Sequence, residues 1–173
     1  MTIRAARPAD LPAIAALCRA HAAFERSQCR DDLDTALEGF LFAGPPPRHR
    51  NAGEDACGPG GETPALREPR GWCAVAEEEQ RLVGYATWSR EFSTWRASDY
   101  VHMDCLFVSE PYRNAGIGAR LLRFVTGAAA ALGCRIVEWQ TPQWNSDAIR
   151  FYDRCGATGS PKIRYRIEVT NGK

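Results

Sequence analysis

The sequence predicts a single α/β domain over residues 1–173, with a mixed, mostly antiparallel sheet flanked by helices. Of the 173 residues, 45% are hydrophobic, which suffices for one core and is little for two domains. Segments in which apolar residues alternate are interspersed with segments in which they recur at helical spacing. The central stretch from Asp104 to Leu132 joins an apolar strand to an amphipathic helix through a turn with two glycines. These three observations favour an α/β fold.

The first half of the chain predicts a strand, two helices and an insertion. Residues 2–6 form the strand, and Asp10 is expected to cap a helix whose apolar face includes His21. His21 is interpreted as a packing residue rather than a ligand. A second helix is expected over 33–42. Residues 44–71 are rich in proline, glycine and charge without apolar periodicity, so a flexible surface insertion is expected, with an active-site lid as the alternative.

The second half predicts a strand meander, the long helix, and two further strands around a short helix. The meander strands are expected over 72–76, 82–88 and 100–108. Alternation along the third of them places Asp104 on one face and Cys105 on the other. The remaining elements are a helix from Ile117, a strand over 135–140, a short helix opened by Asn145 and stopped by Gly156, and a strand over 162–169. The predicted order is β-α-α-β-β-β-α-β-α-β.

Charge and cysteine usage exclude several classes of partner. The chain carries 22 basic and 21 acidic residues, so no global field recruits nucleic acid or an anionic membrane, and neither partner is expected. The seven cysteines form no C-x-x-C pair and have no nearby histidine ligands, which predicts a metal-free protein in the reducing cytoplasm. The N-terminus is polar and the longest apolar run is short, so no signal peptide or membrane span is expected.

The turn at residues 113–119, with the sequence RNAGIGA, has the composition of an anion site. Gly116 and Gly118 stand where the helix begins, and there backbone N–H groups and the helix dipole favour a phosphate. A P-loop is excluded because Ala119 and Arg120 follow the second glycine where Lys and Ser/Thr are needed. A dinucleotide fingerprint is excluded because the third glycine is absent. An ordinary glycine turn is the alternative interpretation.

This R-x-x-G-x-G/A pattern, after LFV and PYR, resembles the coenzyme A pyrophosphate loop of the GNAT superfamily of N-acetyltransferases. Further stretches resemble one branch, the spermidine/spermine (diamine) N-acetyltransferase group, over nearly the whole chain outside the insertion. They are IRAARPADLPAIAAL, HAAFER, LEGFLF, FSTW, HMDCLFV, RNAGIGARLL and WNSDAIRFYDRCGA. Asp104 and Cys105 stand where that group has two adjacent carboxylates, and Thr94 where it sometimes has an acid. A less acidic groove weakens the polyamine interpretation and makes a lysine-like or other small amine comparably expected.

The resemblance implies an enzyme that moves the acetyl group of acetyl-CoA to a primary amine of a small molecule. The amine would be a diamine, a polyamine or a lysine-like compound, and it would attack directly in a ternary complex without a metal. Asp104 is expected to accept the amine proton, directly or through water, and Tyr152 to protonate the departing thiolate. The alternatives are a local ion pair of Asp104 with Arg96 and a packing role for Tyr152.

The resemblance also assigns the binding residues and the assembly. The substrate amine would contact Glu25, Trp95 and Asp104, an aromatic wall with two acids. Acetyl-CoA would contact the backbone of Leu106, Phe107 and Val108, the loop residues Arg113, Asn114, Ala115, Gly116, Ile117, Gly118 and Ala119, and the side chains of Asn145 and Tyr152. Val108 would help to polarise the thioester carbonyl. A homodimer is expected because the resembling group forms one.

Three other functions stay open at this point. The first is acetylation of protein lysines or N-termini, which the near-neutral charge neither supports nor excludes. The second is a coenzyme A-binding sensor without turnover, against which the retention of Asp104 and Tyr152 argues. The third is an acyl-enzyme on Cys105. It is disfavoured because alternation points Cys105 away from Asp104 and no histidine is adjacent to it in the sequence.

Overall fold

The computed structural model describes residues 1–42 and 69–169, and the chain divides into two compact units, Met1–Trp139 and Gln140–Lys173. The predicted insertion at 44–71 lies outside the described residues except for its last three. There the Gly71 N–H donates to the Phe40 carbonyl at 3.2 Å, which ties the chain after the insertion to the second helix. The single domain over 1–173 stays a prediction.

The first unit contains a five-stranded sheet in the order β1-β2-β3-β4-β5. Its strands are β1 (Thr2–Ala5), β2 (Trp72–Glu78), β3 (Arg81–Ser93), β4 (Ser98–Val108) and β5 (Val137–Glu138). The first four are antiparallel to their neighbours, and β5 is parallel to β4. Glu79 and Gln80 both have positive φ, as a two-residue hairpin turn between β2 and β3 requires. The predicted mixed, mostly antiparallel sheet is confirmed.

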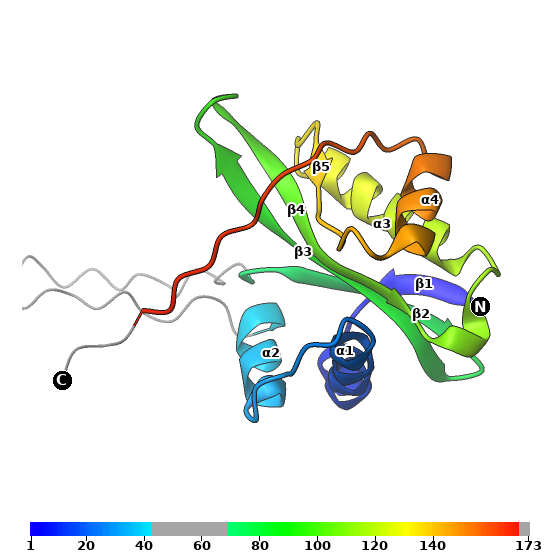
Figure 1. Cartoon of the computed structure of the whole chain (residues 1–173). Coiled ribbons are helices and arrows are strands. Elements are labelled where there is room, and N and C mark those ends of the chain that lie inside the picture. Colours follow the sequence, from blue (N-terminus) through cyan, green and yellow to red (C-terminus); the bar gives the residue numbers. More distant parts are fainter. Residues whose placement is uncertain (43–68, 170–173) are drawn as a thin grey trace, which may run out of the picture. The chain divides into compact units, whose positions relative to one another are not determined.

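Helices cover both faces of this sheet (Figure 1). α1 (Leu11–Phe24) and α2 (Leu33–Leu41) lie on one face, and α3 (Ile117–Ala131) lies on the other. The core under α1 and α2 consists of Ile14, Leu17, Leu41, Cys73, Val75, Tyr85 and Phe107. α3 buries residues at helical spacing, as its sequence predicts: Ile117, Leu121, Leu122, Val125 and Ala129. The strand-turn-helix at the centre of the sequence is therefore held rigidly against the sheet.

The second unit contains α4 (Ser146–Arg154), whose two ends have the predicted chemistry. The Asn145 side chain accepts the Ala148 N–H at 3.2 Å, which satisfies one of the orphan donors of the first turn. Gly156 has a φ of 84°, and the next N–H, of Ala157, donates to the Tyr152 carbonyl at 3.1 Å. The predicted N-cap and the predicted stop are both confirmed.

Three local predictions are wrong. Residues 162–169 form no strand, although they alternate in polarity, and the apolar members Ile163, Tyr165, Ile167 and Val169 are 78–88% exposed. A strand exists only where a neighbour completes its hydrogen bonds, and the described part of the second unit offers no other strand. The strand expected over 135–140 is only two residues long. The Asp10 carboxylate does not cap α1, because it accepts the Arg7 N–H and pairs with Arg4.

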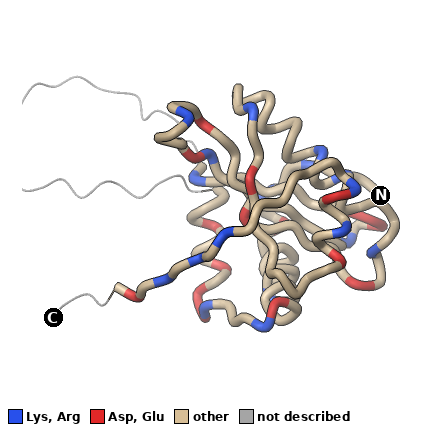
Figure 2. Tube along the Cα trace, turned by 45° about the horizontal axis from the view of Figure 1, so that its top comes forward, with Lys and Arg blue, Asp and Glu red and all other residues tan. Residues whose placement is uncertain are grey.

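Charged residues of both signs are interspersed along the trace, in keeping with the net charge of +1 (Figure 2). Within the described ranges, none of the helices has the length and apolar character that crossing a bilayer demands.

Candidate active site

Asp104 lies in a β-bulge of β4. Thr87 of β3 pairs with Cys105 and the next residue, Trp88, pairs with Met103, so Asp104 has no cross-strand partner. Its side chain is exposed. A bulge residue disrupts the pairing locally and redirects its side chain, and here it presents an exposed carboxylate next to the buried Met103.

The bulge corrects the prediction that Cys105 points away from Asp104. Strict alternation fails there, and the Cys105 Sγ donates to Asp104 Oδ2 at 3.4 Å. Burial raises the pKa of the Cys105 thiol to about 12, and the Asp104 charge adds to the effect. The thiol therefore stays protonated at neutral pH, so the nucleophile that an acyl-enzyme needs is absent.

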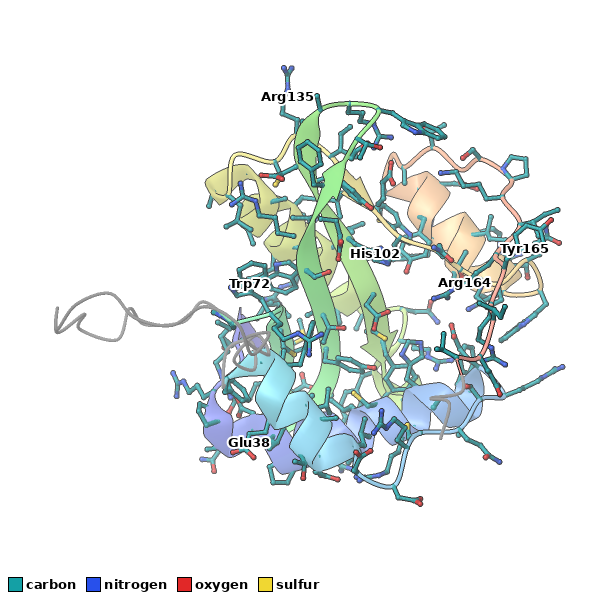
Figure 3. The ribbon with its side chains drawn as sticks, turned by 90° about the vertical axis from the view of Figure 1, so that its left-hand side faces the viewer. Glu38, Trp72, His102, Arg135, Arg164 and Tyr165 are labelled. Atoms are coloured by element: carbon teal, nitrogen blue, oxygen red, sulfur yellow. The ribbon has the colours of Figure 1, made fainter. Side chains whose placement is uncertain are left out.

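Beyond His102, β4 has a strand partner on one side only among the described residues (Figure 3). It pairs with β5 at Val101 and His102, and no strand continues along that edge to Val108. The Ser109 N–H donates to the Val83 carbonyl, so the N–H and carbonyl of the preceding residue, Val108, point to the open edge. The Arg113 Nε donates to this carbonyl at 3.0 Å, while the Val108 N–H remains at the edge. An extended ligand can add to such an edge as a further strand.

The open edge leads into the glycine loop. Asn114 and Gly116 both have positive φ, 62° and 74°, and Gly116 is the N-cap of α3. No side chain caps this helix end, so the first N–H groups of α3 have neither an intrahelical nor a capping side-chain acceptor. Ile117 is 3% exposed and anchors the turn. The loop is thus a rigid set of donors at the positive end of a helix dipole.

A polar cluster lies on the α1 side of β4. His21 Nδ1 is 3.1 Å from the Tyr85 hydroxyl, His21 Nε2 is 3.5 Å from Glu25 Oε1, and the imidazole stacks on the Phe107 ring with centroids 5.0 Å apart. Burial lowers the pKa of His21, and the carboxylates of Glu25 and Asp104 partly oppose this. His21 is therefore a neutral imidazole at pH 7 that interacts with both acids. Its partner Tyr85 was not among the site residues predicted from the sequence.

The other predicted site residues have separate surroundings. The guanidinium of Arg113 lies 4.6 Å from the centroid of the Phe24 ring, so part of its role is to join α1 to the loop. Trp95 is 98% exposed in the β3–β4 turn, and Asp104 lies six residues beyond the start of β4, about 20 Å away along an extended strand. The structure therefore brings Glu25 and Asp104 to one site and leaves Trp95 outside it. Arg96 pairs with Glu138 at 2.6 Å, which is a different partner from the Asp104 of the alternative interpretation.

In the second unit, Asn145 and Tyr152 both belong to α4. Asn145 stands at its N-terminus, and the Tyr152 ring, half-buried, packs on Phe151 with centroids 5.0 Å apart. The Asn145 oxygen is used by the cap, which leaves its amide N–H₂ as the group for a ligand. Among the described residues, no group of three or more His, Cys, Asp or Glu side chains is placed to hold a metal ion.

The fold combines a mixed sheet with an open β4 edge that leads to the uncapped N-terminus of α3, an arrangement suited to an extended ligand with an anionic group. The model of the acetyltransferase (GNAT) family matches residues 29–157. The chain belongs to this family and is an N-acetyltransferase. The family resemblance and the fold class predicted from the sequence are confirmed.

Several relatives are N-acetyltransferases by name. The chain is 28% identical to the thialysine N-epsilon-acetyltransferase of Bos taurus over 156 residues, which are 90% of this chain and 82% of that protein. It is 34% identical over 76 residues, 44% of the chain, to the L-ornithine N5-acetyltransferase NATA1 of Arabidopsis thaliana, and the match spans only 33% of the plant protein. A human spermidine/spermine N(1)-acetyltransferase-like protein 1 is 25% identical over 51% of the chain and 14% of its own length.

Solved structures share the fold. The crystal structure of a possible acetyltransferase from Clostridium difficile 630 has a TM-score of 0.72 and 20% identity, and the match covers 98% of both chains. At this identity the likeness concerns the fold.

Proposed function

We propose that this enzyme transfers the acetyl group of acetyl-CoA to a primary amine of a small diamine, polyamine or lysine-like molecule. The observation that carries the proposal is the exposed Asp104 carboxylate in the β4 bulge, next to the open edge of the same strand. A free amine with a pKa near 10.4 is almost wholly protonated at neutral pH, so a base must take its proton before it attacks a thioester. The relatives named for thialysine and ornithine support a lysine-like amine.

In this proposal the open β4 edge and the glycine loop hold acetyl-CoA. The pantetheine arm pairs with the backbone of Leu106, Phe107 and Val108 as an additional strand, and the Val108 N–H donates to the thioester carbonyl. Hydrogen bonds that strengthen as negative charge develops on this oxygen lower the barrier to amine attack. The pyrophosphate accepts the N–H groups at the start of α3, whose dipole adds to the attraction.

The chemical step is direct attack in a ternary complex. Asp104 takes the amine proton, directly or through a water, and the neutral nitrogen attacks the thioester carbon. The Tyr152 hydroxyl protonates the departing thiolate, because the pKa of a phenol lies near that of a thiol. The Asn145 amide donates to the pantetheine arm. The high pKa of Cys105 argues against the covalent alternative.

The proposal includes a homodimer in the cytoplasm. The described cysteines are all free, as a reducing compartment would keep them. Acetylation of protein lysines or N-termini is the second candidate, and a non-catalytic coenzyme A sensor is the third.

The test is the release of free thiol from acetyl-CoA against a panel of amines. The panel contains L-ornithine, L-lysine, 1,4-diaminobutane, spermidine, an aminoglycoside and a lysine-containing peptide. Turnover with the diamines or amino acids, at a kcat/KM well above that with the peptide, is the expected result. Preference for the peptide would favour the second candidate, and no release with any amine, together with measurable acetyl-CoA binding, would favour the sensor.

A further inference from the structure

His21 interacts with both acids of the candidate amine site, with Glu25 through a 3.5 Å contact and with Asp104 electrostatically. Its side chain is 14% exposed and that of Glu25 is 36% exposed, so the imidazole is a mostly buried support beneath a solvent-facing carboxylate. Three contacts fix the ring: the Tyr85 hydroxyl at Nδ1, the Glu25 carboxylate at Nε2, and the face of Phe107. Phe107 belongs to the strand edge that would hold the thioester. The imidazole thus packs on the strand that would hold the thioester, while its charge-sensitive contact is with the Glu25 carboxylate of the amine site.

The hydrogen-bond partners define the tautomer. Nε2 faces a carboxylate, which only accepts, so Nε2 carries the hydrogen of the neutral ring, and Nδ1 accepts the Tyr85 O–H. Burial raises the pKa of the Tyr85 phenol, so the hydroxyl keeps its proton. In this state the neutral His21 ring, held by Tyr85, orients the Glu25 carboxylate without neutralising it. The charges of Glu25 and Asp104 are then both available to a cation.

Protonation of His21 changes this balance. The groups that act on the His21 charge are Glu25 on α1, Asp104 on β4 and Arg113 after it. Its hydrogen-bond partner Tyr85 on β3 interacts in turn with Cys18 and Cys105. An imidazolium at this place adds one positive charge beside the two acids. A substrate ammonium brings the same charge to the same acids, so the two cations oppose each other.

We propose that His21 is a positioning residue of the amine site, which holds Glu25 beside Asp104 when neutral and competes with the amine cation when protonated. The inference rests on the proposed function and deepens it, because it assigns the loss of amine affinity at acid pH to one side chain. The inference favours a substrate with two cationic groups, one to pair with Glu25 and one to pair with Asp104. The expected consequence is that the KM for the amine rises about tenfold as His21 becomes protonated, while the KM for acetyl-CoA stays constant.

The first experiment measures KM for L-ornithine and 1,4-diaminobutane between pH 5.5 and 8.5 in the wild type and in His21→Gln. Glutamine keeps a donor and an acceptor without a charge, so the variant should lose the rise at acid pH and retain turnover. His102→Gln is the matched control: His102 lies on β4 (Figure 3), and the variant should retain the wild-type profile. If the KM for the amine still rises at acid pH in His21→Gln as it does in the wild type, the inference is overturned.

The second experiment does not need turnover. The chain has three histidines, so the His21 signals in an NMR titration of the wild type can be identified as those missing from His21→Gln. By linkage, an amine that binds tenfold more weakly to the protonated form lowers the His21 pKa by about one unit. If the protein acetylates L-ornithine but 20 mM L-ornithine does not change the His21 pKa, the inference is overturned while the proposed function stands. If the panel shows no turnover, the proposed function fails separately, and a His21 pKa shift with L-ornithine would still show the cation site.

Discussion

At the scale of the residue, the site depends on a departure from regular structure. Asp104 is available to solvent because one extra residue interrupts the β3–β4 pairing, and Cys105 turns to donate to it. The Cys105 thiol reaches this carboxylate as an uncharged hydrogen-bond donor. Tyr152 is the other residue with a proposed proton-transfer role, and it lies on α4 of the second unit.

Tyr152→Phe separates proton donation from packing. The phenylalanine keeps the ring that packs on Phe151 but lacks the hydroxyl, so kcat should fall about 100-fold at a nearly unchanged KM for acetyl-CoA. Steady-state kinetics with the best amine of the panel measure both constants. Phe151→Leu is a neighbouring control that perturbs packing and keeps the hydroxyl. Wild-type turnover in Tyr152→Phe would remove the assignment of Tyr152 as the general acid.

At the scale of the element, the junction of β4 with α3 fixes the co-substrate site. The loop reverses direction through two residues with positive φ, and Arg113 closes it by donating to the Val108 carbonyl and stacking on Phe24. The helix then buries Ile117 at once. This short connection fixes the position of the α3 N-terminus relative to the open edge of β4.

Gly116→Ala tests the loop, and Gly127→Ala in the middle of α3 is its control. A Cβ at either position meets no atom within 4 Å, so the two differ in backbone conformation alone. Gly116 has a φ of 74°, and alanine there should cost about 1 kcal/mol and raise the KM for acetyl-CoA. Gly127→Ala should stabilise the helix by about 0.5–1 kcal/mol without a kinetic effect. Thermal unfolding and acetyl-CoA titrations measure the two effects; an unchanged KM in Gly116→Ala would exclude the loop from binding.

At the scale of the whole molecule, the sheet with α1, α2 and α3 carries the burial of the described residues, and residues 161–169 contribute none of it. The core residues lie between Ile14 and Cys134, whereas residues 161–169 are exposed throughout. Hydrophobic stabilisation follows the apolar area removed from water. The stability of the first unit therefore should not depend on that segment.

Truncation after Ser160 tests this. The midpoint of thermal unfolding should change by less than about 2 °C, because exposed side chains contribute little to the free energy of unfolding. Differential scanning calorimetry gives the midpoint, and light scattering of the full-length and truncated chains gives the mass of each. A drop of 5 °C or more, with loss of a species of twice the 19.1 kDa chain mass, would show that a second copy covers the segment.

The sequence predicted what depends on local patterns. The strands of the meander, the periodicity of α3, the Asn145 cap and the glycine loop all follow from propensity and spacing within a few residues. The bulge at Asp104 could not be predicted, since it arises in the pairing of Cys105 and Met103 with residues of another strand, and strict alternation was the natural expectation. The same holds for the His21–Tyr85 bond, which joins residues 64 positions apart. A histidine on an apolar helix face was the one visible signal. Residues 162–169 alternate in polarity but form no strand. Alternation therefore predicts a tendency to pair and does not identify the partner strand.

The bulge also bears on how this gene can change. Because side chains alternate with a period of two, the extra residue shifts the phase of everything that follows it, from Cys105 to the glycine loop. Loss of the Asp104 codon would leave Met103 and Cys105 opposite the same β3 residues and restore strict alternation, with the exposed carboxylate gone. A one-residue deletion here could therefore leave the sheet intact and remove the carboxylate, so the length of this strand matters to the site more than to the fold.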